Sequence, residues 1–185
     1  GGAGTYCEEL VHACDQLSIP IKVWLPEYAK KLKSSKFNVL PVKGSQGWVC
    51  SIKSVWTMAK NLKSDSNRVT LHLAEPGSLR AFVRFGWLLS KMPDLIVTIH
   101  GTELLRFCAN PLEKFLFRRL LMKSRQIHVL SNYNKFALLK LVPEMEKKIL
   151  LFPGAPARRL MGRGKKKVFR KDEKKSAISD TRADR

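Results

Sequence analysis

The sequence has few acidic residues and no long apolar run. Its 185 residues include 35 lysines and arginines but only 15 aspartates and glutamates, a formal net charge of +20. No apolar run reaches the roughly 18 residues that a membrane-spanning helix needs, so no such helix is predicted. An excess of positive charge concerns the partners of a protein and not its fold. The candidate partners are therefore nucleic acid, an anionic membrane surface or an anionic substrate.

The patterns that mark metal sites and common catalytic sets are also missing. The four cysteines show no CxxC spacing and no histidine cluster lies beside them, so neither a metal site nor a disulfide is expected. Reduced, buried thiols in a cytoplasmic protein are the preferred interpretation. No Ser-His-Asp set, P-loop or paired metal site is recognisable. The chain opens on Gly1-Gly2 and not on Met, so we expect a fragment or a processed form.

Segments with strand and helix patterns alternate along the chain. Apolar β-prone runs predict strands at 21–25, 37–42, 69–74, 95–99, 126–130 and 148–152. Helical spacings lie between them at 6–17, 49–62, 79–92, 111–123 and 131–141. This alternation predicts an α/β domain with a parallel, Rossmann-like sheet, right-handed crossovers and helices on both faces. We expect the domain to cover residues 1–156, followed by a basic linker or tail at 157–185. Residues 158–185 hold twelve basic against four acidic residues, a net of +8.

The stretch 95–104 is the centre of the predicted sheet. Five β-prone residues, 95–99, are followed by His100 and Gly101, which suits a strand that is buried on both faces. Ligands of open α/β sheets bind at the carboxyl ends of the strands. His100 is therefore the first candidate site residue, and the alternative is a histidine that hydrogen-bonds a backbone carbonyl. His72 lies inside a strand and is predicted to belong to the core.

Other candidate residues allow both a ligand role and a structural one. Gly1 to Gly4 precede a helix, and a glycine-rich loop at a helix N-terminus can hold a phosphate. Thr102 and Glu103 could contact an acceptor or cap a helix. Glu75 could line an acceptor pocket, although a role in the turn is favoured. Asn110 and Pro111 are typical of a helix start, and Ser131 of an N-cap.

The ordered set of these motifs resembles the amino-terminal domain of family-4 glycosyltransferases, the retaining sugar transferases of the GT-B type. The family pattern has a Gly-Gly loop and helix, a strand ending in His-Gly, a strand ending in Ser, and a strand ending in Pro-Asn-Gly. The corresponding residues here are 1–4, 99–104, 129–131 and 151–154, so the resemblance covers about residues 1–156. The chain departs from the pattern at its end, because Pro153 adjoins Gly154 without the usual Asn.

The resemblance implies a function that is divided between two domains. The chain would form the acceptor side of a cleft, and a carboxyl-terminal domain outside this chain would hold most of a nucleotide-sugar donor. The fragment alone would be inactive, the acceptor would be a sugar or a lipid-linked sugar, and no metal or other cofactor is expected. The first strand of the sheet, a central one, would be missing. His100 would face the transferred sugar, and the donor or acceptor would lie near Gly1, Gly2, Gly101, Thr102, Glu103 and Glu75.

Two interpretations of the positive charge and one further function class remain open. Helix 111–123 carries Lys114, Arg118, Arg119 and Lys123 on one side, which suits either a solvated face or an anionic membrane surface on the cytoplasmic side. The Lys165–Lys167 run would support nucleic-acid binding, but no specific nucleic-acid motif is present. A non-catalytic sugar-binding module is the third class.

Overall fold

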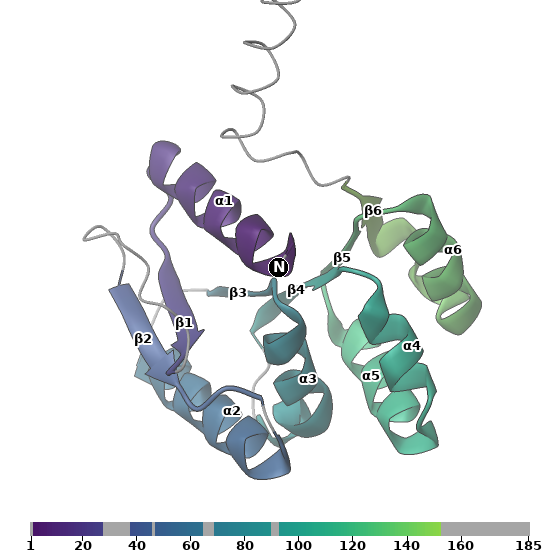
Figure 1. Ribbon diagram of the computed structural model, residues 1–185, viewed down its shortest axis with the longest axis horizontal. Helices are drawn as coiled ribbons and strands as arrows, with labels where there is room; N and C mark the ends of the chain where they lie inside the picture. The colour runs from purple at the N-terminus through teal and green to yellow at the C-terminus, as the bar shows by residue number, and fades with distance from the viewer. Residues whose placement is uncertain (1, 28–37, 46, 65–68, 90–92, 153–185) are drawn as a thin grey trace, which may run out of the picture. The chain divides into compact units, whose positions relative to one another are not determined.

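The protein is an α/β domain of mostly parallel strands flanked by helices (Figure 1). The computed structural model describes residues 2–27, 38–45, 47–64, 69–89 and 93–152. The elements are α1 (Gly2–Gln16), β1 (Lys22–Pro26), β2 (Asn38–Val42), α2 (Gly47–Ser64), β3 (Thr70–Leu73), α3 (Pro76–Phe85), the 3-10 turn η1 (Gly86–Leu88), β4 (Asp94–Ile99), α4 (Thr102–Cys108), α5 (Pro111–Lys123), β5 (Gln126–Val129), α6 (Asn132–Leu141), the 3-10 turn η2 (Pro143–Lys148) and β6 (Ile149–Leu151).

The strands form two sheets in which every pairing is parallel. Strands β3, β4, β5 and β6 follow one another in one sheet, while β1 and β2 form a separate pair. The expected parallel pairing is thus confirmed, and the strand that carries His100 at its end is an inner one. The single continuous sheet that the sequence suggested is interrupted between β1 and β3.

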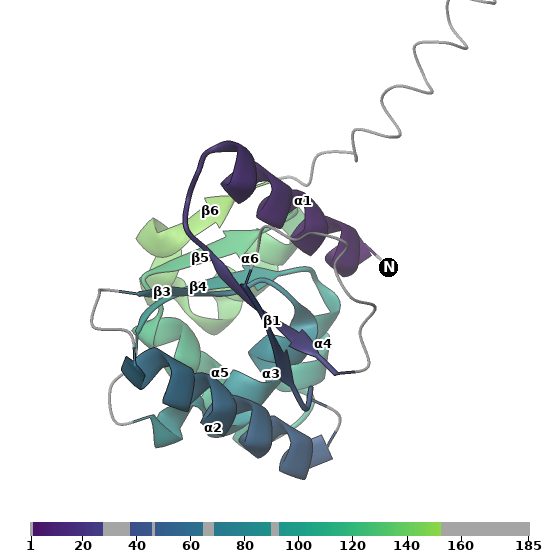
Figure 2. The ribbon, with the colours of Figure 1, turned by 90° about the vertical axis from the view of Figure 1, so that its left-hand side faces the viewer.

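The four-stranded sheet has one apolar face and one face that is partly polar. The apolar face is fully buried, because α3, α5 and α6 supply side chains to the same core. Its strand residues are Leu71, Leu73, Leu95, Val97, Ile99, Ile127 and Val129. The opposite face carries His72, Thr98 and His128, which lie on one side of the sheet by the strand register. Figures 1 and 2 show α1 on this side and α2, α3 and α5 on the other, so helices cover both faces.

Two predicted elements differ from the observed ones. The chain is already helical at Gly2, so the loop expected at 1–4 is wrong over residues 2–4. Glycine costs a helix only about 1 kcal/mol relative to alanine and does not prevent one. The helix expected at 79–92 begins earlier, at Pro76, and ends at Phe85. The segment 28–37 and the basic tail lie outside the described residues.

Helix α5 begins and ends where the sequence predicts, but its buried side is different. Asn110 caps it, since its side chain accepts hydrogen bonds from two first-turn amides. The sequence places Leu112, Phe115, Leu116, Leu120 and Met122 on one apolar side. Leu120 is buried together with Phe117 and Leu121, whereas Leu112, Phe115 and Met122 are 49–61% exposed. Because α5 is apolar on two sides, periodicity could not decide which side is buried. The tilted contact of Phe117 with Phe107 of α4, 4.8 Å between ring centroids, lies on the buried side.

Candidate ligand site at the carboxyl edge of the central strand

The candidate site lies where β3 and β4 end and α1 crosses the sheet. Ala74 and Glu75 follow β3, and His100 and Gly101 follow β4. Since parallel strands end at the same edge of a sheet, these residues meet there. Helix α1 reaches the same edge, because Tyr6 contacts His100 and the Cys7 thiol lies 3.5 Å from the carbonyl oxygen of Ala74.

His100 is held by one ring nitrogen, which leaves the other for a ligand. Its Nε2 lies 2.8 Å from the carbonyl oxygen of Ala74. A carbonyl can only accept, so Nε2 carries the proton and Nδ1 of the neutral ring is an acceptor. The ring meets Tyr6 edge to face, with 5.4 Å between centroids, and remains partly exposed. The hydrogen bond to a backbone carbonyl that is expected of a structural histidine is therefore present, and no described residue hydrogen-bonds Nδ1.

Gly101 shapes the turn that presents His100. Its φ of +134° lies in a region that L side chains rarely adopt. A Cβ on this residue would also lie 3.3 Å from both amide atoms of the Asn134 side chain on α6. A glycine is thus required both for the backbone conformation and for the close approach of α6.

The two candidate carboxylates act mainly as helix caps. Glu103 is only 3% exposed; its Oε2 accepts a 2.7 Å hydrogen bond from the Gly101 amide, and its Oε1 has no partner among the described residues. Glu75 accepts hydrogen bonds from the amides of Gly77 and Ser78 at the start of α3. Of the two roles open for each residue, the structural one is present. For Glu103, one buried oxygen remains unused.

The remaining predicted positions are only partly near this edge. Thr102 is the exposed first residue of α4, and Gly2 begins α1 four residues before Tyr6. Gly1 lies outside the described residues. Ser131 caps α6 as predicted, because its hydroxyl accepts a hydrogen bond from the Asn134 amide.

Sequence reasoning missed the groups that α1 and α6 bring to the edge. Tyr6 and Cys7 have helical apolar spacing and were therefore assigned to a core face. Burial, with Glu75 as a second cause, raises the pKa of the Cys7 thiol to about 11. Cys7 is thus a neutral structural thiol and not a nucleophile. Asn134 has one local signal, its position three residues after the predicted cap Ser131.

His72 is part of the structure, as predicted, and forms a small polar cluster on the sheet. Its Nε2 lies 2.8 Å from the Thr98 hydroxyl, and its ring meets that of His128 edge to face. Burial, with the neighbouring His128 as a second cause, lowers the pKa of His72 to about 4. Burial also lowers the pKa of His128. Both rings are therefore neutral near pH 7.

A cavity of about 410 Å³ lies at the opposite edge of the sheet, where β4 and β5 begin. Two of its three cationic side chains have partners: Lys148 donates to the carbonyls of Met122 and Ser124, and Arg125 pairs with Asp94. These bonds hold the segment at the end of α5 to β4 and to the end of η2. We therefore assign this cavity to structure and keep the carboxyl edge as the candidate site.

Metal and membrane-spanning features are not found in the described part of the chain. No three histidine, cysteine or acidic side chains come together there in a way that could hold a metal ion. Among the same residues, no helix is both long and apolar enough to cross a bilayer. The four cysteines are free thiols, and Cys108 is exposed, contrary to the expectation that all four are buried.

Comparison with known proteins adds no family assignment. No protein-family model matches the chain, and no curated protein matches it either.

Proposed function

We propose that this domain is the acceptor-side half of a retaining sugar transferase that uses a nucleotide-sugar donor. The observation that carries the proposal is His100 at the carboxyl end of β4, with Nε2 bound to Ala74 and Nδ1 left as an acceptor. The resemblance to family-4 glycosyltransferases supports the same assignment. The parallel sheet with helices on both faces is the architecture that such a domain requires.

The chemistry of this edge suits a ligand rich in hydroxyl groups. Nδ1 of a neutral imidazole accepts a hydrogen bond, and a sugar hydroxyl can donate one. In this role His100 orients a sugar, and the Ala74 carbonyl fixes both its tautomer and its ring plane. Glu103 is a positioning residue, because its bond to the Gly101 amide holds the turn that follows His100. A second lobe would bring the donor diphosphate.

A transfer assay on the gene product that contains this chain tests the proposal. The protein is incubated with a panel of nucleotide sugars and with sugar and lipid-linked acceptors, and NMR gives the anomeric configuration of the product. We expect retention, and His100→Ala should lower transfer on the order of 100-fold because it removes a positioning contact. His12→Ala is the control, since His12 is an exposed histidine on α1. Absence of transfer with every donor, or full activity of His100→Ala, would contradict the proposal.

We further propose that α5 rests on an anionic membrane surface. Leu112, Phe115 and Met122 form an exposed apolar stripe along this helix. Arg119 is exposed next to it, and so is Arg118, which pairs with Glu144 at 2.9 Å. Apolar side chains can enter the headgroup region while flanking arginines meet anionic lipids. This combination is stronger support for a membrane contact than the basic side alone.

Vesicle sedimentation tests the membrane contact. The chain should bind vesicles that contain phosphatidylserine at low salt, and the Leu112→Ser/Phe115→Ser variant should lose most of that binding. Leu17→Ser is the matched control, because Leu17 is 70% exposed at the end of α1, away from the stripe. A chain that ignores anionic vesicles at low salt, or equal binding by the double variant, would rule the contact out.

A further inference from the structure

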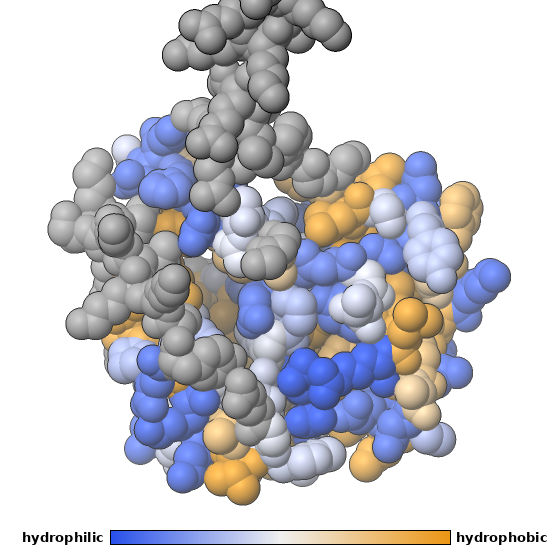
Figure 3. Space-filling view, in the orientation of Figure 1, coloured by the Kyte–Doolittle hydropathy of each residue, from blue (hydrophilic) through white to orange (hydrophobic). Residues whose placement is uncertain are grey.

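Two arginines for which the described residues show no hydrogen bond or ion pair, Arg80 and Arg106, lie on the helices α3 and α4, which begin at the candidate site. Arg80 lies five residues after Glu75, the N-cap of α3, and Arg106 lies five residues after Gly101, the N-cap of α4. The Nε of Arg80 is buried and has no hydrogen-bond partner among the described residues. Figure 3 shows strongly hydrophilic side chains gathered between α3 and α4.

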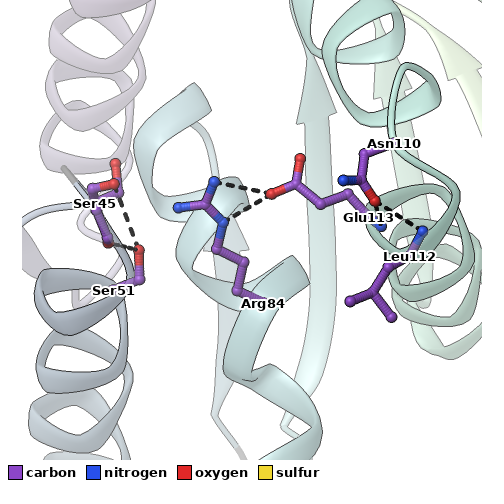
Figure 4. Close-up of polar contacts among 7 residues, drawn as sticks. Ser45, Ser51, Arg84, Asn110, Leu112 and Glu113 are labelled. Atoms are coloured by element: carbon purple, nitrogen blue, oxygen red, sulfur yellow. Dashed lines mark hydrogen bonds and ion pairs between the residues drawn. The ribbon is translucent and has the colours of Figure 1, made fainter.

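The other arginine of α3, Arg84, already has partners. Arg84 places Nε and a terminal nitrogen 2.9 Å from one carboxylate oxygen of Glu113 on α5 (Figure 4). Its guanidinium also lies 4.7 Å from the ring centre of Trp48 on α2. Arg84 is only 9% exposed, so its charge is balanced and its position fixed. Arg84 therefore needs no ligand to balance its charge.

The charge around Arg80 is not balanced by the protein. Burial lowers the pKa of Arg80, and so do the neighbouring charges of Arg106 and Arg84. Glu75 and Glu113 are the acids that act in the opposite direction. Glu75 is bound to the amides of α3, and Glu113 is bound to Arg84. Among the described charges that act at this position, three arginines stand against two glutamates, so one positive charge remains in excess.

We propose that Arg80 and Arg106 bind a phosphate group, as a phosphate or pyrophosphate ester of a larger ligand. Guanidinium groups bind phosphate oxygens through paired, charge-assisted hydrogen bonds, and two arginines close enough for their charges to interact suit a dianion. A phosphate oxygen would also satisfy the Nε of Arg80, a donor whose burial without a partner is otherwise costly. The biological meaning, a phosphorylated substrate whose sugar reaches His100, rests on the proposed function. Binding of the anion itself does not.

The test measures the arginine side chains of the chain directly, with inorganic pyrophosphate and inorganic phosphate as probes. A 15N–1H spectrum of the arginine Nε–H groups is recorded at low ionic strength during each titration. We expect the Arg80 Nε–H signal to move and saturate. Arg106→Gln should weaken the affinity about 10-fold or more, as the loss of a charge-assisted contact implies. Lys140→Gln, which removes an exposed cation of α6 that has no assigned role, should leave the affinity unchanged.

A second arm separates soluble phosphates from lipid phosphates. Vesicles of phosphatidic acid in phosphatidylcholine replace the soluble probe, and binding is compared between the parent chain and Arg106→Gln. Dependence on Arg106 in the soluble arm assigns the site to a soluble phosphate, and dependence in the vesicle arm alone assigns it to a lipid headgroup. The proposal is overturned if the Arg80 signal stays unmoved and Arg106→Gln binds like the parent in both arms.

The outcome is independent of sugar transfer, because no donor sugar is present in either arm. Arg106 is exposed, so its replacement leaves the fold intact, and a melting curve checks this. Arg80→Lys adds a second variant that keeps the charge but removes Nε. If the cluster binds phosphate through Arg80, this variant loses affinity although its net charge is unchanged.

Discussion

Mild acid should destabilise the domain through His72. The ring is largely enclosed between the sheet and α1, and its Nε2 lies 2.8 Å from the Thr98 hydroxyl. Burial is the main cause that lowers its pKa from 6.5 to about 4, and the nearby His128 adds to the effect. The unfolded chain frees the imidazole to take up a proton at its ordinary pKa.

The sign and size of the effect follow from this difference. Between pH 6.5 and pH 4 the unfolded state binds more protons than the folded state, so the free energy of unfolding falls as the pH falls. Each pH unit within this window costs about 1.4 kcal/mol, and the whole shift from 6.5 to about 4 amounts to about 3 kcal/mol. Above pH 6.5 the contribution of His72 is constant. His128, whose pKa burial also lowers, acts in the same direction.

Urea unfolding at pH 7.5, 6.5, 5.8 and 5.0 measures the effect before most carboxylates titrate. The parent chain should lose roughly 2 kcal/mol of unfolding free energy between pH 6.5 and pH 5.0 through this group. His72→Gln keeps a hydrogen-bonding side chain that does not titrate, so its stability should depend less on pH. His12→Gln, at an exposed position of α1, should follow the parent. Parallel pH curves for the parent chain and His72→Gln would refute the reasoning.

Three other predictions follow from single contacts. Iodoacetamide at pH 8 should label the exposed Cys108 well before Cys7, because a pKa of about 11 leaves roughly one Cys7 thiol in a thousand ionised. Mass spectrometry would locate the label. Glu113→Ala should lower the unfolding free energy by about 3 kcal/mol in urea titrations, since it leaves Arg84 charged and 9% exposed; a loss below 1 kcal/mol would contradict this. Gly101→Ala should cost about 1–3 kcal/mol, because φ of +134° strains an alanine, and an unchanged melting temperature would show that the turn can relax.

Local signals in the sequence were sufficient for the elements around the site. The strand 94–99 was recognisable because its β-prone residues end abruptly in His100 and Gly101. Helix α5 was recognisable from its start, because Asn110 and Pro111 mark it by short-range hydrogen bonding and backbone geometry. These features depend on neighbours within a few residues. A single sequence can therefore reveal them.

Features that depend on distant contacts could not be predicted. Tyr6 and His100 are 94 positions apart in the chain, and only the passage of α1 across the sheet brings their rings together. The ion pair of Arg84 and Glu113 joins two helices, and in the sequence each residue is one charge among many. Phe117 was not counted among the buried residues of α5 because the other side of the helix is equally apolar. Long-range packing, and not propensity, decides these cases.

The break between the two sheets and the candidate site have a common origin in the topology. Across Figure 1 the strands follow the order β2, β1, β3, β4, β5 and β6. A doubly wound sheet winds outward in both directions from its first strand, and the helices change face where the direction reverses. Here α1 lies on one face and α3 and α5 on the other, so the reversal falls between β1 and β3. This is where a first strand would lie, as the resemblance implied. Trp24 of β1 still packs against the common core, so the two sheets share side-chain contacts without pairing there.

Ligands of such folds bind at the carboxyl side of the reversal. The hydrogen bond between His100 and Ala74 lies at the end of β3, next to this reversal. The position of the reversal, between β1 and β3, is therefore an argument for this edge as the candidate ligand site.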